Sequence, residues 1–134
     1  MKGTKPTLVI PADGLSDVLP PPDWLGDDAA EEWIRVQPIL AERRILTDAD
    51  LGSLENYCVS IGLVREAERY LQDNGPIVET ESGPKRSPAV GIQKDGITMA
   101  RQLAAELGLT PVSRSRPSIR EVGKDDEVDP LNIS

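Results

Sequence analysis

The chain has 134 residues, a length typical of one domain, and it carries 15 Lys or Arg against 23 Asp or Glu, a net charge of -8. With no histidine and one cysteine, it excludes an internal disulfide, metal sites built from His and Cys, and nucleophilic catalysis with a histidine base. Phe is absent and 12 Pro and 11 Gly interrupt the chain, so we expect a small aliphatic core that partner copies enlarge.

Residues 1–26 predict a proline-rich flexible leader. Pro6, Pro11 and the run Pro20-Pro21-Pro22 prevent a continuous helix, because proline lacks the N–H that a helix needs. Leu8-Val9-Ile10 is the one apolar element in the leader. The segment is either disordered or an arm that docks on a neighbour. It does not resemble a signal peptide, and no stretch of the chain reaches the ~18 apolar residues that would span a bilayer.

A first helix is expected over about 28–44, with Asp27 or Asp28 as its N-terminal cap. Its apolar face consists of Trp33, Val36 and Leu40. Pro38 lies inside this pattern, so we expect a kink or a break there.

A second and longer helix follows, because Thr47-Asp48-Ala49-Asp50 predicts an N-cap and Gly75 predicts a C-terminal cap. A helix of about 27 residues would be ~40 Å long. Its apolar positions are Leu51, Leu54, Cys58, Ile61, Val64 and Leu71. Gly52 and Gly62 either weaken this helix or mark close contacts between helices.

Residues 76–88 predict a short β-hairpin or an ordered loop, with a turn at Ser82-Gly83-Pro84. A hairpin of two strands is marginal alone, so it should pack on a helix or pair with another subunit. A third helix begins near Pro88 and ends at Gly108, the expected left-handed cap. Its apolar face consists of Ile97, Ala100, Leu103, Ala104 and Leu107.

The predicted fold is therefore mainly α-helical, a helical bundle or hairpin with a long central helix and disordered termini. Residues 27–111 form the helical oligomerisation core, and residues 112–134 form an arginine-rich strap followed by an acidic disordered tail. The residues expected to build the core and the contacts between copies are Trp33, Leu54, Cys58, Ile61, Val64, Ala100, Leu103 and Leu107.

The sequence contains no recognisable catalytic apparatus. Two glycines of the segment 91–96 have the spacing of a phosphate-binding loop, but Ile97-Thr98 follows where Lys and Ser or Thr are needed. Cys58 lies on an apolar helix face, which favours core packing over reactivity. The carboxylate pairs Glu31/Glu32, Asp48/Asp50 and Glu66/Glu68 are interpreted as solvated helix faces and caps. We therefore expect no catalytic residue, no metal and no cofactor.

Three short basic clusters could neutralise phosphates, or could be ordinary solvated charges. They are Arg43-Arg44, Lys85-Arg86 and Arg114/Arg116/Arg120. Residues 89–120 carry five basic and two acidic side chains, whereas residues 121–134 carry one basic and five acidic ones. A helix-turn-helix built from the first two helices is disfavoured, because Asp48 and Asp50 would begin the recognition helix and repel the phosphates beside the groove.

A set of short motifs in a characteristic order resembles the small subunit of a tailed-phage terminase over about residues 20–118. The most specific motif is the closing segment Glu106-Leu107-Gly108-Leu109-Thr110-Pro111, followed by Ser113-Arg114. The earlier matches are Leu25, Trp33, Pro38, Leu40, the junction Ile45-Leu46-Thr47-Asp48-Ala49-Asp50, the step Leu54, Tyr57 and Cys58, then Ser82-Gly83 and Pro88. The chain differs from many small terminases in its first residues, where a proline-rich leader takes the place of their helix-turn-helix domain.

The resemblance implies a non-enzymatic packaging component in the host cell cytoplasm. Such a protein binds viral double-stranded DNA and passes it to a large terminase subunit that carries the ATPase and nuclease. It also assembles as a ring of identical copies, without contact to a membrane. Arg114 and Arg116 are the first candidates for phosphate contact, then Lys85 and Arg86, then Arg43 and Arg44. The acidic tail would either shield the arginines or bind the large subunit. Two other classes remain open: a phage ring adaptor of the head–tail connector type, and a helical DNA-binding regulator.

Overall fold

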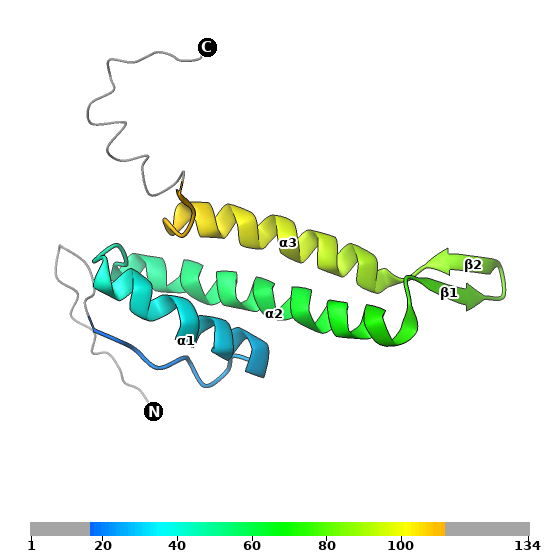
Figure 1. Cartoon of the computed structure of the whole chain (residues 1–134), viewed down its shortest axis with the longest axis horizontal. Helices are drawn as coiled ribbons and strands as arrows, with labels where there is room; N and C mark the ends of the chain where they lie inside the picture. Colours follow the sequence, from blue (N-terminus) through cyan, green and yellow to red (C-terminus); the bar gives the residue numbers. More distant parts are fainter. Residues whose placement is uncertain (1–16, 112–134) are drawn as a thin grey trace, which may run out of the picture.

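A computed structural model describes residues 17–111 of the chain. Residues 1–16 of the predicted leader and the predicted strap and tail, residues 112–134, lie outside the described residues. The elements within residues 17–111 are α1 (Asp27–Glu42), a single 3-10 turn η1 (Asp48–Asp50), α2 (Leu51–Asn74), β1 (Ile77–Thr80), β2 (Gly83–Arg86) and α3 (Pro88–Glu106). Helices α1 and α3 lie antiparallel to α2, one on each side of it, and α2 makes the main contacts with both (Figure 1). The prediction of a mainly helical fold with a long central helix and a two-stranded hairpin is confirmed.

The core joins all three helices and is mostly aliphatic, but the expectation of a wholly aliphatic core is wrong because Trp33 and Tyr57 are buried in it. Its buried members are Leu25, Ala29, Trp33, Val36, Leu40, Leu46, Leu54, Tyr57, Cys58, Ala100 and Leu107. Ile61 and Leu103 are partly buried and pack against this cluster. Val64 is half-buried on the side of α2 that faces Gly96 of α3. The apolar spacing of the two longer helices thus identifies the surface along which they meet.

Helix α1 begins and ends earlier than predicted. Gly26, not Asp27 or Asp28, occupies the N-cap position, and the helix runs through Pro38 without a break. Its end is a Schellman turn, because the Ile45 N–H donates to the Leu40 carbonyl at 3.1 Å while Arg44 adopts a left-handed backbone with φ +55°. The helix therefore ends at Glu42, two residues before the predicted boundary at Arg44.

Residues 17–26, which the sequence assigned to a flexible leader, are instead held against α1. The Trp33 indole Nε1 donates to the Leu19 carbonyl at 2.8 Å, and the Leu19 N–H donates to the Gln37 side-chain oxygen at 3.0 Å. The Gln37 amide nitrogen donates to the Asp17 carbonyl at 2.9 Å. The prolines that prevent a helix here leave backbone groups free to bond with the polar atoms of buried side chains on α1.

Helix α2 has 24 residues and is preceded by η1, so the predicted length of about 27 residues was too long. The Thr47 N–H and hydroxyl both donate to Asp50 Oδ2, at 3.0 and 2.8 Å, and hold this start. At the other end Gly75 has φ +79° and its N–H donates to the Leu71 carbonyl, as predicted for a cap. Gly62 does mark a close helix contact, with the Ala29 backbone, whereas Gly52 faces open space.

The hairpin forms, but its turn is Glu81-Ser82 rather than Ser82-Gly83-Pro84, because Thr80 pairs with Gly83. It extends beyond the end of the α2–α3 pair (Figure 1). Helix α3 then starts with Pro88, and the Ser87 hydroxyl accepts from the Ala89 N–H at 3.1 Å.

The expected apolar face of α3 was wrong at one position, since Ile97 is 49% exposed while its neighbour Gly96 is buried. A methyl group on Gly96 would lie 2.8 Å from Val64 Cγ2, so the glycine lets the two helices approach closely and turns Ile97 away from α2. At the end of α3, Gly108 adopts φ +76° and the Leu109 N–H donates to the Ala104 carbonyl, which confirms the predicted left-handed cap.

Candidate functional site

The two basic clusters that lie in the described residues occupy opposite ends of the molecule. Arg43 and Arg44 follow the last turn of α1, whereas Lys85 and Arg86 belong to β2 in the projecting hairpin (Figure 1). All four side chains are exposed. A single copy therefore cannot use both clusters on the same short stretch of a ligand.

The end that carries Arg43 and Arg44 is also the end where α3 stops. A methyl group placed on Gly108 would lie 3.6 Å from the Ile45 side chain, so the segment after α1 contacts the turn after α3. Described structure ends at Pro111, three residues before Arg114. Arg114, Arg116 and Arg120 lie outside the described residues.

The hairpin is a weaker candidate for contact with an anion. Glu79 and Glu81 are exposed in the same hairpin as Lys85 and Arg86, so the four charges cancel. Ile77 pairs with Arg86 in the antiparallel register, and alternation along the strand places Glu79 on the same face as Ile77 and Arg86. A phosphate approaching Arg86 would therefore meet a carboxylate as well.

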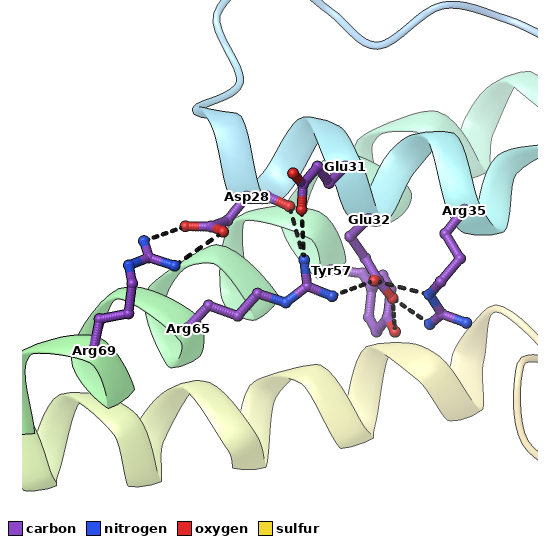
Figure 2. Close-up of polar contacts among 7 residues, drawn as sticks. All are labelled: Asp28, Glu31, Glu32, Arg35, Tyr57, Arg65 and Arg69. Carbon is purple, nitrogen blue, oxygen red and sulfur yellow. Dashed lines mark hydrogen bonds and ion pairs between the residues drawn. The ribbon is translucent and has the colours of Figure 1, made fainter. Parts of the chain in front are cut away.

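A buried ionic cluster between α1 and α2 is the polar site that the sequence reasoning missed (Figure 2). Glu32 is fully buried and accepts from the Tyr57 hydroxyl at 2.6 Å, from Arg35 Nε at 3.0 Å and from Arg65 Nη2 at 3.0 Å. Near the start of α1, Asp28 accepts from both terminal nitrogens of Arg69, at 3.2 and 2.5 Å. The interpretation of Glu31/Glu32 as a solvated pair is wrong for Glu32, although Glu31 is exposed.

The sequence did contain a signal for this site, because Glu32 falls on the same helical stripe as Val36 and Leu40. Burial alone would raise the pKa of Glu32, but the hydrogen bonds from Arg35 and Tyr57 outweigh it and hold the pKa below its usual range. The carboxylate thus stays ionised and clamps α1 to α2. Arg65 and Arg69, which bond the carboxylates of α1, are occupied by this structural role.

The thiol of Cys58 is poorly placed to react. Cys58 is fully buried, and burial raises the pKa of its thiol to about 12, so the reactive thiolate is scarce near neutral pH. Between residues 17 and 111 no group of three or more Cys, Asp or Glu side chains is placed to hold a metal ion. None of the helices in this range combines the length and hydropathy needed to cross a membrane.

Comparison with known proteins gives one clear result. The family model described as phage terminase, small subunit, matches residues 29–124, which is most of the chain and includes α2, α3 and all of α1 except its first two residues. No curated protein sequence matches significantly, and no solved structure does either. The matched range contains both the α1–α2 clamp and the end where α1 and α3 stop. The chain therefore belongs to the phage terminase small-subunit family and has a role in phage DNA packaging.

Proposed function

We propose that this chain binds viral double-stranded DNA through the end of the molecule where α1 and α3 stop, and that it brings the DNA to the large terminase subunit. The observation that carries this proposal is the contact between Ile45 and Gly108, which joins the Arg43-Arg44 cluster to the exit of α3. Arg114 follows Pro111 by three residues in the sequence, so the proposal assigns the Arg114/Arg116 cluster and the Arg43-Arg44 cluster to the same end of the molecule.

The net charge of -8 means that a single copy has little general attraction for DNA. Repetition changes this balance, because a closed ring of identical copies places the same basic end on one rim many times. Each weak phosphate contact then acts at high effective concentration. The ring forms by head-to-tail contacts, as expected for identical copies whose contact surfaces differ. Arg114, Arg116 and Arg43 rank before Lys85 and Arg86, whose hairpin lies at the opposite end and is neutral overall.

In this proposal the chain has no catalytic step. The large subunit supplies the ATPase and nuclease, and the small subunit acts in the host cytoplasm as the DNA-recognition ring. The acidic segment 121–134 either covers the arginines in the absence of DNA or binds the large subunit. Deletion of residues 121–134 separates these roles, since loss of a shield raises DNA affinity and loss of a docking segment lowers affinity for the large subunit.

The test is a DNA titration by fluorescence anisotropy at several salt concentrations. Replacing Arg114 and Arg116 together by alanine should weaken binding and make the slope of log K against log salt about 2 units shallower per copy engaged, since each lost phosphate contact contributes ~0.9. The matched control replaces Lys85 and Arg86 by alanine, which removes the same charge from the far end. If the control variant loses as much affinity and slope as the arginine variant, the proposed DNA-binding end is wrong.

Binding that is absent in the wild-type protein under all salt conditions would favour the alternative of a ring adaptor. A dimer that binds DNA would favour the helical regulator instead. The measured mass of the wild-type assembly therefore accompanies the titration.

A further inference from the structure

Two adjoining hollows along α2 combine exposed apolar side chains with charged ones. A hollow of about 400 Å³ lies between α2 and α3, and a second of about 470 Å³ lies between α2 and the start of α1. Leu63 and Glu66 line both, so the two hollows adjoin along α2 and are considered together as one groove. The other large apolar and aromatic side chains of the groove are Trp24, Val59, Tyr70 and Ile92. We call this groove the front groove.

The front groove exposes side chains that a soluble monomer would bury. Trp24 is 61% exposed, Tyr70 47%, Ile92 48% and Leu63 44%. The chain has four aromatic residues in all, and the other two, Trp33 and Tyr57, are buried in its own core. Two aromatic rings of this exposure leave roughly 200 Å² open to water, and aromatic side chains that are exposed beside a hollow are typical of the centre of a protein interface.

The opposite side of α3 carries a surface that matches this groove. Ile97 is 49% exposed, and Lys94 and Arg101 lie three residues before and four residues after it on the same helix face. Ile92 and Ile97 are five residues apart, which places them about 140° apart around α3. The helix thus presents an apolar side chain between two exposed cations on the side that faces away from the front groove.

The charges of the two surfaces are complementary. Glu66 is exposed where the two hollows adjoin, and Asp27, Asp28 and Arg69 also line the second hollow. Arg69 is paired with Asp28, and the three carboxylates and one guanidinium give this lining a net charge of -2. An apolar side chain flanked by Lys94 and Arg101 fits an apolar groove that is bordered by carboxylates, because the cations then lie against acids while the isoleucine is removed from water. An acidic partner would meet repulsion from the same carboxylates.

We propose that the front groove of one copy receives Ile97, Lys94 and Arg101 of a second copy of this chain. This inference rests on the proposed assembly into a ring and names the two surfaces that make it, but it does not depend on DNA binding. Because the groove and the Ile97 surface lie on different sides of the same molecule, the contact is heterologous. It leaves the first copy with a free Ile97 surface and the second copy with a free groove. Such contacts continue from copy to copy until the ring closes.

The test measures the mass of the full-length protein in solution by light scattering, without DNA. Ile97→Glu and Leu63→Glu should each weaken assembly at least tenfold, seen as a shift from the wild-type mass towards the single copy at the same concentration. Ile34→Glu is the matched control, because Ile34 is 61% exposed on α1 and lines neither hollow. Assembly should be unchanged in this variant.

A charge reversal guards against variants that merely fold poorly. Glu66→Lys alone, and Lys94→Glu with Arg101→Glu, should each weaken assembly, while the three changes together in one chain should restore at least part of it. Retention of the wild-type mass in Ile97→Glu and Leu63→Glu, or no recovery in the combined variant, would overturn the proposed contact. A stable dimer that is insensitive to Ile97→Glu would also overturn it, because it would indicate that two front grooves meet face to face.

Tryptophan fluorescence identifies what covers the groove. Trp33 is buried in a single copy, so acrylamide quenching reports mainly on Trp24. Quenching should fall when the wild-type protein assembles and should stay high in Ile97→Glu. If protection of Trp24 is instead lost on deletion of residues 1–16, with the mass unchanged, the occupant is the N-terminal segment and the proposal is wrong. If the mass and quenching results are as expected but the protein does not bind DNA, the proposed function is wrong and the proposed contact between copies stands.

Discussion

Removal of the buried carboxylate of Glu32 should cost far more stability than removal of its neighbour. In Glu32→Ala the Tyr57 hydroxyl, buried between α1 and α2, loses the acceptor at 2.6 Å. A buried donor left without its partner costs about 1–3 kcal/mol. Arg35 and Arg65 also lose hydrogen bonds at 3.0 Å, but both guanidinium groups reach water, so each adds at most ~1 kcal/mol. We expect a total loss of about 3 kcal/mol in the free energy of unfolding.

The assay is urea denaturation followed by circular dichroism, at one fixed protein concentration because assembly contributes to apparent stability. Glu31→Ala is the matched control, since Glu31 is exposed and contacts Arg65 only at 3.5 Å. Removal of such a surface ion pair costs at most ~0.5 kcal/mol. The reasoning fails if the two variants lose similar stability.

The same variant has a defined pH dependence. The pKa of Glu32 is lowered in the folded protein, so its contribution is complete above the ordinary value of 4.5 and disappears as the pH falls through the lower folded value. The stability difference between wild type and Glu32→Ala should therefore be largest near neutral pH and should narrow as the pH falls below 4.5. A difference that stays constant from pH 7 to pH 3 would show that the lost interaction is not with the ionised carboxylate.

Three further outcomes follow from the packing and the turns. Gly96→Ala should lower the free energy of unfolding in urea by about 1–3 kcal/mol, because its methyl group would lie 2.8 Å from Val64 Cγ2. Gly91→Ala on the same helix has nothing within 4 Å of the added methyl group and should be neutral or stabilising. Equal effects of the two changes would contradict the close approach of α2 and α3. The Arg44→Gly variant should be about 1 kcal/mol more stable than the Arg44→Ala variant, because both lose the side chain and only glycine adopts φ +55° freely. The opposite order of melting temperatures would contradict the Schellman turn. Cys58 should resist a thiol reagent at pH 8 in native protein and react fully in urea, because burial raises the pKa of its thiol to about 12; rapid native labelling would be inconsistent with its burial.

Local patterns in the sequence determined the elements and several of their ends, among them the end of α2 and both ends of α3. The spacing of Leu54 and Cys58, the Thr47 cap, and the glycines at 75 and 108 act within one or two turns of helix, so they can be recognised without a tertiary structure. The motif that closes with Pro111 also identified the family, which the family comparison shows. These signals could not show that Asp17–Gly26 lies along α1, because that contact depends on the distant side chain of Gln37.

Only the tertiary structure decided which charges are buried in structural contacts and which lie exposed at the surface. Glu32 bonds with side chains 25 and 33 residues away, Tyr57 and Arg65, and no local pattern encodes that distance. The meeting of α1 and α3 at one end, and the exposure of Ile97 beside a buried Gly96, likewise depend on how closely α2 and α3 approach. A sequence determines which face of each helix is apolar through its period of 3.6 residues. Which helices then share that face, and which polar groups become buried between them, depends on contacts between segments that are distant along the chain.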